Sequence, residues 1–406
     1  MFEFLDSEIP PLSDREFNSL GRKLNIDDIY SLPKEVRYCT ECVISNQRPR
    51  ITFNEDGVCS ACIYWKQKAS EISWTDREAE LWELCNRFRK NDGSFDVLVP
   101  SSGGKDSVYV AHLLKTKFNM HPLTMTWSPH VYTQIGLYNF FAQIHAGLDN
   151  ILLSPNGPVH RRMCRISTIE MGDPFQPFIY GQTYVPLRIA AAQGISLIMD
   201  GENGEAEYGG DITSAGLRGF TADDAEKYWL SGFPLEFWHE YGFTSGDLEL
   251  YRPPTPNEMQ DRSIERHFFS YYTDWRPQQH YYYCVENTGF RPNPDGRSQA
   301  TYSKYASLDD ELDPYHYYFA LLKFGLGRAT SDAAHEIREG LIAREEAVAL
   351  VNRFDAEEPS EHNRSVFLRY TGLTGEQLDS SLALWRNSRL WDTSGPGAAE
   401  LKFSAS

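Results

Sequence analysis

The chain has 406 residues, of which 41% are hydrophobic and 14% aromatic, and its formal net charge is −18. This length predicts two or three domains with a substantial core, and the negative charge opposes nucleic-acid binding, which depends on neutralising phosphates. No apolar stretch approaches the roughly 18 residues of a membrane helix, and the acidic N-terminus lacks the form of a signal peptide. These features predict a cytoplasmic protein with neither a membrane nor a nucleic acid as partner.

Two cysteine pairs follow residues 1–36, a leader of mixed helix and loop to which no chemistry can be assigned. They are Cys39-x-x-Cys42 and Cys59-x-x-Cys62, and two such knuckles present four thiolates to one ion, as in structural zinc sites. The odd total of seven cysteines argues against a disulfide framework. An iron–sulfur cluster is the alternative, but the ferredoxin spacing is absent from the sequence. We therefore predict a zinc module over residues 37–66.

A glycine-rich turn follows a helical connector, residues 67–94. An apolar run ends at Pro100, and the loop Ser101-Ser-Gly-Gly-Lys-Asp-Ser107 leads into a segment with helical spacing. Gly103 and Gly104 let the backbone approach a ligand, and the free N–H groups at a helix start favour an anion. The alternative is an ordinary strand-to-helix turn without a ligand.

The side chains of this loop also suit a polyphosphate. Ser102 and Ser107 offer hydroxyl donors, Lys105 offers a positive charge, and Asp106 offers oxygen ligands for magnesium. The spacing is not that of Walker A, which needs four residues between its first glycine and Gly-Lys. The loop resembles Ser-Gly-Gly-x-Asp-Ser, the pyrophosphate loop (PP-loop) of the ATP pyrophosphatase superfamily. The resemblance implies that ATP is split between its α- and β-phosphates to adenylate a carbonyl-type oxygen.

Short apolar runs alternate with helical segments from residue 95 onward. The expected strands are 96–99, 121–127, 150–154 and 195–200, and the expected helices are 106–117, 135–146 and 184–193. This alternation predicts an α/β domain over residues 95–211, with a parallel sheet covered by helices on both faces.

Ligands of such sheets bind beyond the carboxyl ends of the strands. Trp127 and Gly201 fall there and are expected to contact the nucleotide. Asp200 and Glu202 are candidates to bind metal, to orient ammonia or to accept its proton, although a solvated turn is the alternative.

A long functional loop is expected over residues 171–178, because Pro174 and Pro177 oppose a regular helix. Three arginines precede it: Arg161, Arg162 and Arg165. We expect them to be exposed on a helix face, and contact with an anionic substrate is the alternative.

Residues 212–320 are rich in aromatic side chains, which suit a sugar-binding surface, a core or an interface. Residues 321–393 are expected to be helical, with helices at 331–339 and 343–352, the first capped by Thr330 or Ser331. Lys323 and Arg328 precede that helix and are expected to contact phosphate, unless the segment is only a capped helix pair. Residues 394–406 are expected to be disordered.

Taken in order, these motifs resemble the N-acetyl sugar amidotransferases of bacterial surface-polysaccharide synthesis. The resemblance rests on the cysteine knuckles, the PP-loop and three further stretches, namely 171–174, 200–210 and 323–330. It covers roughly residues 37–370 and implies an adenine nucleotide alpha hydrolase-like fold with a zinc-ribbon-like module. It also implies an enzyme that uses ATP, Mg²⁺ and Zn²⁺ to convert an acetamido group of a free or nucleotide-linked sugar into an acetamidino group.

The resemblance implies a separate glutaminase subunit, similar to that of imidazole glycerol phosphate synthase, and in some systems a relative of its cyclase. The residues agree, because Cys85, Cys164 and Cys284 lack the Gly-x-Cys-x-Gly elbow that exposes a nucleophile. Ammonia must then be delivered to the chain. In the expected mechanism, the amide oxygen attacks the α-phosphorus of ATP, the loop binds pyrophosphate, and ammonia displaces AMP.

Two other functions stay open from the sequence. A tRNA thiolase of the same superfamily also combines cysteine pairs with this loop, but it needs a persulfide-carrying cysteine, for which Cys164 is the candidate, and a basic RNA-binding face. A non-catalytic ATP-binding scaffold is the second alternative.

Overall fold

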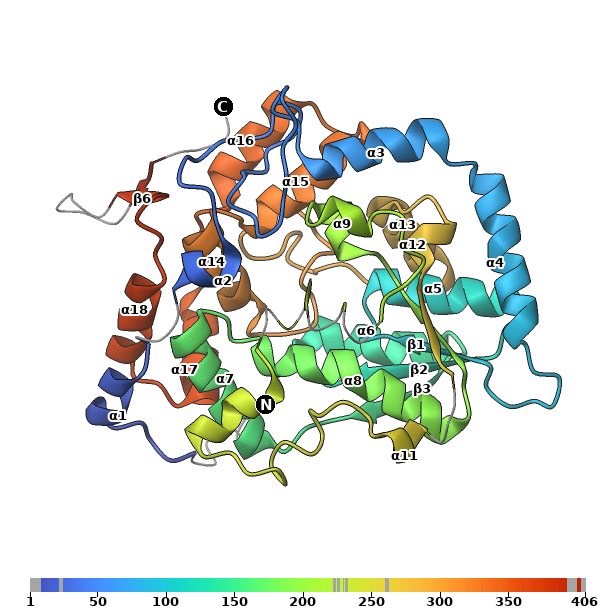
Figure 1. Ribbon diagram of the computed structural model, residues 1–406, viewed down its shortest axis with the longest axis horizontal. Helices are drawn as coiled ribbons and strands as arrows, with labels where there is room; N and C mark the ends of the chain where they lie inside the picture. Colours follow the sequence, from blue (N-terminus) through green and yellow to red (C-terminus); the bar gives the residue numbers. More distant parts are fainter. Residues whose placement is uncertain are drawn as a thin grey trace.

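A five-stranded parallel sheet forms the centre of the protein (Figure 1). The computed structural model describes residues 9–21, 25–221, 224, 227–228, 230, 233–259, 263–392 and 400–402. The strands are β1 (Val97–Pro100), β2 (Pro122–Trp127), β3 (Asp149–Leu153), β4 (Leu197–Asp200) and β5 (Glu265–Phe268). Their order is β3-β2-β1-β4-β5, and every neighbouring pair is parallel. The predicted parallel α/β sheet is confirmed, and β5 is an additional strand that the sequence did not suggest.

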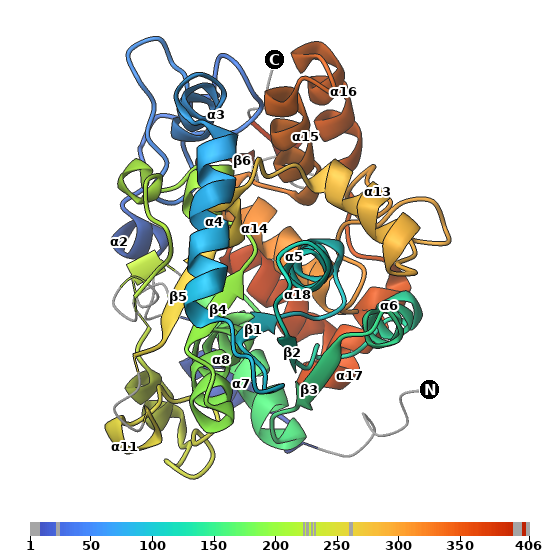
Figure 2. The same cartoon turned by 90° about the vertical axis from the view of Figure 1, so that its right-hand side faces the viewer.

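Helices cover both faces of the sheet, as expected. The helices of this region are α5 (Lys105–Thr116), α6 (Gln134–His145), α7 (Gly157–Met171), α8 (Gln176–Gln193) and α9 (Gly204–Tyr208). Val97 and Val99 of β1 pack with α5, whereas Leu98 between them packs with α7 and α8, because successive side chains of a strand point to opposite faces. Figure 2 shows α5 above the sheet and α7 and α8 below it.

The elements before the sheet belong to the N-terminal part of the chain. They are α1 (Asp14–Ser19), α2 (Ile26–Tyr30), α3 (Ser60–Glu71) and α4 (Trp74–Phe88). Helix α4 forms the expected connector and packs against the α5 face of the sheet through Leu81 and Leu84. The cysteine knuckles share a core with Ala333 and Val351 from the C-terminal part. The N-terminal and C-terminal parts of the chain therefore share a core at this module.

The segment between β4 and the C-terminal helices is mostly irregular where it is described. Its elements are η2 (Ile212–Ser214), η3 (Leu235–Tyr241), α11 (Pro256–Met259), α12 (Phe269–Tyr272) and α13 (Pro277–Asn287). Many of its aromatic side chains are core residues, and Trp238, Trp275 and Tyr251 are each at most 1% exposed. Core packing therefore accounts for these three aromatic residues.

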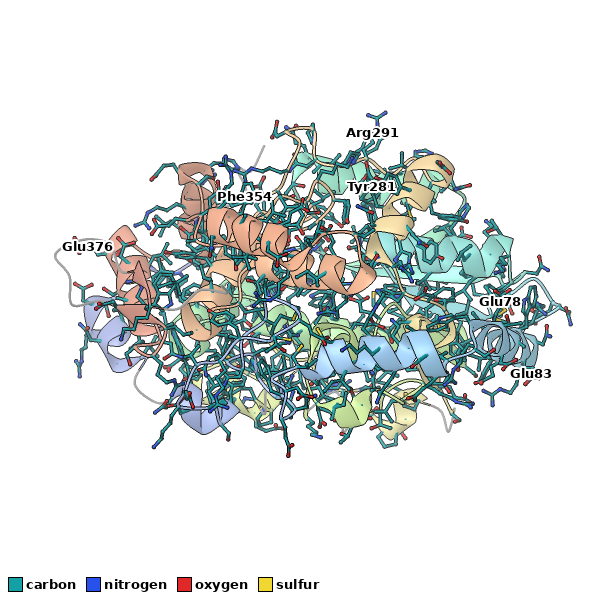
Figure 3. The ribbon with its side chains drawn as sticks, turned by 90° about the horizontal axis from the view of Figure 1, so that it is seen from above. Glu78, Glu83, Tyr281, Arg291, Phe354 and Glu376 are labelled. Carbon is teal, nitrogen blue, oxygen red and sulfur yellow. The ribbon has the colours of Figure 1, made fainter. Side chains whose placement is uncertain are left out.

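Helices dominate the C-terminal part, as expected. They are α14 (Asp313–Phe324), α15 (Arg328–Glu339), α16 (Arg344–Phe354), α17 (Glu361–Thr371) and α18 (Gly375–Leu384). Seen from above, Glu376 of α18 and Glu83 of α4 mark opposite ends of the molecule (Figure 3). No helix in the described ranges combines the length and the apolar character needed to cross a membrane.

The tail and the cap of α15 differ from the sequence expectations. Most of residues 394–406 lie outside the described residues, but β7 (Glu400–Leu401) pairs with β6 (Trp391–Asp392), so disorder is wrong there. Gly327 occupies the N-cap of α15, and the carboxylate of Asp355 accepts the N–H of Thr330. The expected cap by Thr330 or Ser331 is wrong because a distant carboxylate takes that role.

The expected loop over residues 171–178 is also wrong. Helix α8 already begins at Gln176, and Pro177 lies in its first turn. Backbone N–H groups in the first turn have no acceptor within the helix, so a proline, which lacks an N–H, is tolerated there. Gly172 ends α7 in the left-handed conformation, with φ of 56°. The connection between α7 and α8 is therefore a tight turn over residues 172–175.

Two of the three arginines on α7 are buried, so the expectation of exposed side chains is wrong for them. Arg161 and Arg165 are each 5% exposed. Arg161 donates to the carbonyl oxygens of Tyr370 and Arg369, and Arg165 donates to that of Pro10, all at 2.8 Å. They bind α7 to the C-terminal helices and to the N-terminal segment.

Helix α8 packs against the end of β2 at a glycine. A Cβ built on Gly181 would lie 2.1 Å from the indole of Trp127. We expect Gly181→Ala to displace this indole and to lower the free energy of unfolding by about 1–3 kcal/mol, the usual cost of overpacking. Denaturant unfolding with tryptophan fluorescence measures both effects, and Gly204→Ala, which meets no atom within 4 Å, is the control. An unchanged midpoint for Gly181→Ala would contradict the close packing.

Candidate functional site

The four knuckle cysteines come together as predicted. Their sulfur atoms all lie within 4.8 Å of one another, with 3.7 Å between Cys42 and Cys59 and 4.0 Å between Cys39 and Cys62. Four thiolates around zinc, with Zn–S bonds of about 2.3 Å, give sulfur separations of about 3.8 Å. The backbone N–H groups of Glu41, Cys42 and Cys59 point at the sulfur of Cys39 and would stabilise a thiolate there. The cluster thus fits a structural zinc ion.

The zinc module holds α9, the short helix that follows Glu202. Arg50 forms a two-pronged ion pair with Glu205 at 2.5 and 2.9 Å, and Lys68 pairs with Glu207 at 2.8 Å. Arg48 Nε donates to the carbonyl oxygen of Gly209 at 2.6 Å. The Lys68–Glu207 pair is at most 2% exposed, so breaking it leaves an uncompensated buried charge. The module, together with Lys68 of the adjoining α3, therefore fixes Glu205, Glu207 and Gly209.

Metal removal should release this segment. A structural zinc ion contributes about 10–16 kcal/mol of apparent binding free energy in small modules, so we expect chelation to unfold residues 37–66 and to raise hydrogen exchange over 200–211. Exchange in β2 and α5 should stay unchanged, which is the internal control. Unchanged exchange over 200–211 after metal loss has been verified would contradict the positioning role.

The loop of residues 101–104 lies at the topological switch point of the sheet. It follows β1, and residues 201–203 follow β4, the neighbour of β1 on the other side. Strand order reverses between these two strands, which is where open α/β sheets bind ligands. Gly103 has a φ of 95°, and a Cβ on it would lie 2.7 Å from the backbone nitrogen of Phe140, so the loop needs glycine there. Helix α5 begins at Lys105 with its first N–H groups facing the loop region.

Asp106 is held between two side chains. Lys105 Nζ donates to its Oδ2 at 2.5 Å, and His280 Nδ1 donates to its Oδ1 at 2.8 Å. Burial alone would raise the pKa of Asp106, but Lys105 and the hydrogen bond from His280 outweigh it and hold the pKa well below its usual range. Burial lowers the pKa of His280, and its Nε2 accepts the N–H of Arg276. A neutral imidazole thus fixes an ionised carboxylate.

The two carboxylates at the end of β4, Asp200 and Glu202, have different environments. Asp200 forms a two-pronged ion pair with Arg266 at 2.6 and 2.8 Å, and this pair is largely buried. Glu202 has no ion pair among the described residues. Burial first, and then the charge of Asp106, raises the pKa of Glu202 to about 7. Glu202 can therefore exchange a proton near neutral pH.

Two joined cavities open at this edge of the sheet. The loop cavity, of about 280 Å³, is lined by Ser102, Gly103, Gly104, Lys105, Asp106 and Ser107. The larger cavity, of about 600 Å³, is lined by Trp127, Asp200 and several further aromatic and acidic side chains. Glu202, Gly201, Ser102 and Ser107 line both. The structure thus brings the loop of residues 101–107, Trp127 and residues 200–202 together.

Of the two cations expected to contact phosphate, one lies at this site. Arg328 lines the loop cavity, pairs with Asp332 at 3.1 Å and donates to the hydroxyl of Tyr317 at 2.5 Å. Lys323 lies instead in a separate pocket, because Gly325 ends α14 in a left-handed turn and redirects the chain. Proximity to Arg328 in sequence therefore does not place Lys323 at the loop.

Several residues of the site carry no sequence signal that we recognised. His280 and Arg266 come from elements far along the chain, and Asp309 lines both cavities. Burial raises the pKa of Asp309. Gly136 allows the backbone of Asp309 to approach, since a Cβ there would lie 2.4 Å from its Cα. The only sequence feature that hints at this close contact is a glycine inside a segment of helical pattern.

The three cysteines outside the module are buried. Cys85, Cys164 and Cys284 are each 0% exposed. Burial raises the pKa of Cys85 and Cys284 to about 12 and that of Cys164 well above its usual value. Reactive thiols are accessible and have lowered pKa values. The burial and the raised pKa values of these three cysteines therefore do not suit the persulfide carrier that a thiolase needs.

Comparisons with known proteins agree with a role in polysaccharide synthesis. Residues 299–403 match the family described as "LPS biosynthesis protein WbpG-like, C-terminal domain". The segment matched contains Tyr305, Asp309 and Arg328, which line the loop cavity. An uncharacterized protein of Methanocaldococcus jannaschii is 31% identical over 87 residues, which is 21% of this chain and 30% of that protein. The family match supports a place among surface-polysaccharide biosynthesis proteins.

Proposed function

We propose that this chain is an ATP-dependent amidotransferase that converts a sugar N-acetyl group into an acetamidino group during surface-polysaccharide synthesis. The observation that carries the proposal is the pair of joined cavities at the switch point of the sheet. One is lined by the PP-loop, and the other by Trp127 and acidic side chains. The proposal includes an adenine nucleotide alpha hydrolase-like fold for the sheet domain. The lipopolysaccharide-related C-terminal segment supplies part of the cavity wall.

The loop cavity receives the pyrophosphate part of ATP. The N–H groups at the start of α5, with Ser102 and Ser107, donate to phosphate oxygens. Lys105 neutralises charge that develops on the leaving pyrophosphate. Asp106, kept ionised, is the ligand for magnesium, which would supply further charge stabilisation. Arg328 faces the same cavity and adds a second cation.

The larger cavity receives the acetamido group and the rest of the nucleotide. The amide oxygen attacks the α-phosphorus, forming an O-adenylyl imidate and releasing pyrophosphate. Ammonia then adds to the imidate carbon, and the C–O bond to AMP breaks. Glu202, at the boundary of both cavities, accepts a proton from the added nitrogen, whereas Asp200 orients Arg266 and the end of β4.

Ammonia comes from a separate glutaminase subunit in this proposal. The three cysteines outside the zinc module are fully buried, which does not suit a glutaminase nucleophile in this chain. The enzyme would work in the cytoplasm, where ATP and nucleotide-linked sugars are available.

The direct test is pyrophosphate release from ATP with ammonium chloride and a panel of free and nucleotide-linked N-acetyl sugars. We expect release that depends on one class of sugar and a product about one mass unit lighter, because NH replaces oxygen. Release with unmodified tRNA and a sulfur donor, but with no sugar, would favour the thiolase. ATP binding without pyrophosphate release under all these conditions would favour the scaffold.

A further inference from the structure

A further, smaller pocket shares His316 with the larger cavity. We call it the basic pocket, and it has a volume of about 190 Å³. It is formed by α2, residues 48–50 of the zinc module, the turn after α7, and α14. Figure 1 shows α2 beside α14, and the rings of Tyr30 and Phe324 meet there at 5.1 Å. His316 lines both the basic pocket and the larger cavity.

Four cationic side chains and two carboxylates decide the charge of this pocket. Asp173 pairs with His316 at 2.9 Å, and Glu205 pairs with Arg50 at 2.5 Å. Within each of these two pairs, the positive and the negative charge neutralise one another. Arg48 and Lys323 also line the pocket, and neither has an ion pair within 4 Å among the described residues. The pocket thus carries two cations without a direct ion-pair partner, in a chain whose net charge is −18.

Both cations are held in place by neutral acceptors. Lys323 is 3% exposed, and its Nζ donates to the carbonyl oxygen of Met171 at 3.1 Å. An ammonium has three donor hydrogens, so this one bond leaves donor capacity toward the pocket. Burial lowers the pKa of Lys323 to about 8, with Asp173 acting in the opposite direction. Arg48 uses Nε for the carbonyl oxygen of Gly209, which leaves both Nη groups for a ligand.

A buried cation without an ion-pair partner is costly, so the buried Lys323 in a pocket is a candidate to bind an anionic ligand. We infer that the basic pocket binds an oxyanion carried by the acceptor sugar, and that this oxyanion is a phosphate of a nucleotide carrier. The inference rests on the proposed function. A planar guanidinium binds two phosphate oxygens at once, and the lysine adds a point charge. The shared wall at His316 would let one substrate reach the larger cavity and the basic pocket together.

Charge reversal inside the pocket provides the first test. Ala320 lines the pocket on α14, so Ala320→Glu places a carboxylate near Lys323, and Ala320→Gln adds the same volume without charge. We expect Ala320→Glu to weaken binding of inorganic phosphate and of UDP by about tenfold or more in calorimetric titrations. Ala320→Gln should have a much smaller effect, and Lys117→Met, at an exposed lysine that lines neither the loop cavity nor the basic pocket, should leave this binding intact. Equal effects of the two Ala320 variants would overturn the inference.

Steady-state kinetics provide the second test. Lys323→Met should raise KM for a nucleotide-linked N-acetyl sugar by about tenfold and leave KM for ATP unchanged. The same substitution at Lys117, which is exposed at the far end of α5, is the matched control. A rise in KM only for acceptors that carry a sugar carboxylate would keep the oxyanion site but overturn the carrier phosphate. An equal rise for neutral free sugars would overturn the inference.

The two proposals fail in different ways. Sugar-dependent pyrophosphate release that is insensitive to Lys323 and Ala320 would remove the basic pocket as a substrate site but keep the amidotransferase. Absence of release with every sugar would remove the amidotransferase, and with it the assignment of the oxyanion to a sugar. Phosphate binding that responds to Ala320→Glu would in that case still show an anion site.

Discussion

Replacing Asp106 with asparagine should reduce pyrophosphate release by a factor of about 10²–10³ without unfolding the protein. Asparagine keeps the shape of the side chain and can still accept the hydrogen bond from His280, so the substitution removes mainly the charge. That charge is maintained by Lys105 and His280, which hold the pKa of Asp106 well below its usual range against the effect of burial. A magnesium ligand must be ionised at working pH, and Asp106 meets that requirement.

The measurement is initial-rate pyrophosphate release at saturating ATP, with the acceptor sugar found to support turnover. Asp379→Asn is the control, because this exposed carboxylate on α18 forms only a surface ion pair with Arg364 and the chemical change is the same. ATP binding should persist in Asp106→Asn, which separates lost chemistry from a lost site. Full activity of Asp106→Asn would contradict the assignment of the loop to metal and pyrophosphate.

Local patterns in the sequence sufficed for the centre of the fold. The strands β1 to β4 are short apolar runs, and each predicted strand overlaps the observed one. The glycine-rich turn and the cysteine knuckles are also encoded by a few neighbouring residues, whose spacing carries their geometry. The meeting of the loop with residues 200–202 then followed from the rule that parallel strands end at one edge.

Features that depend on distant packing were missed. The strand β5 reads Glu265-Arg-His-Phe268, and three of its four side chains are only partly buried, so an edge strand of this kind lacks the apolar run of a central one. Because β5 was missed, the pairing of Arg266 with Asp200 was missed too. His280 reaches Asp106 from a helix more than 170 residues later in the chain, and nothing near it in sequence marks that contact.

The prolines show how a local rule can mislead. Pro177 opposes helix in an interior position but is accepted in the first turn of α8, and Pro186 lies inside the same helix. The arginines of α7 illustrate a second limit, because their periodicity does not reveal which face will be covered. Arg161 is buried by carbonyl acceptors from α17, an element about 200 residues away.

Glu202→Gln should abolish the step that consumes ammonia while having a smaller effect on the binding of ATP. Glu202 lies on the wall shared by both cavities, and burial, with the charge of Asp106, raises its pKa to about 7. A base must be deprotonated to accept a proton, so wild-type kcat/KM at constant free ammonia should rise with pH through about 7. A glutamine cannot accept that proton, and general acid–base catalysis contributes factors of about 10²–10⁴.

The same raised pKa makes a separate prediction for stability. Glutamate has an ordinary pKa of 4.5, so between pH 4.5 and about 7 the folded protein binds the Glu202 proton more tightly than the unfolded chain does. The contribution of Glu202 to the free energy of unfolding is therefore most favourable below pH 4.5, and it is lost as pH rises through about 7. Glu202→Gln should accordingly become more stable relative to wild type across this window, which denaturant unfolding at pH 5 and pH 8 measures.

A Glu202→Gln variant that is less active than wild type and, at pH 8, more stable would indicate that this carboxylate serves catalysis and lowers the stability of the fold. Asp200→Asn is the contrasting variant, because it breaks the ion pair with Arg266 and should lose stability instead. Loss of stability in Glu202→Gln at pH 8, or an unchanged pH–rate profile, would contradict the role of Glu202 as the base.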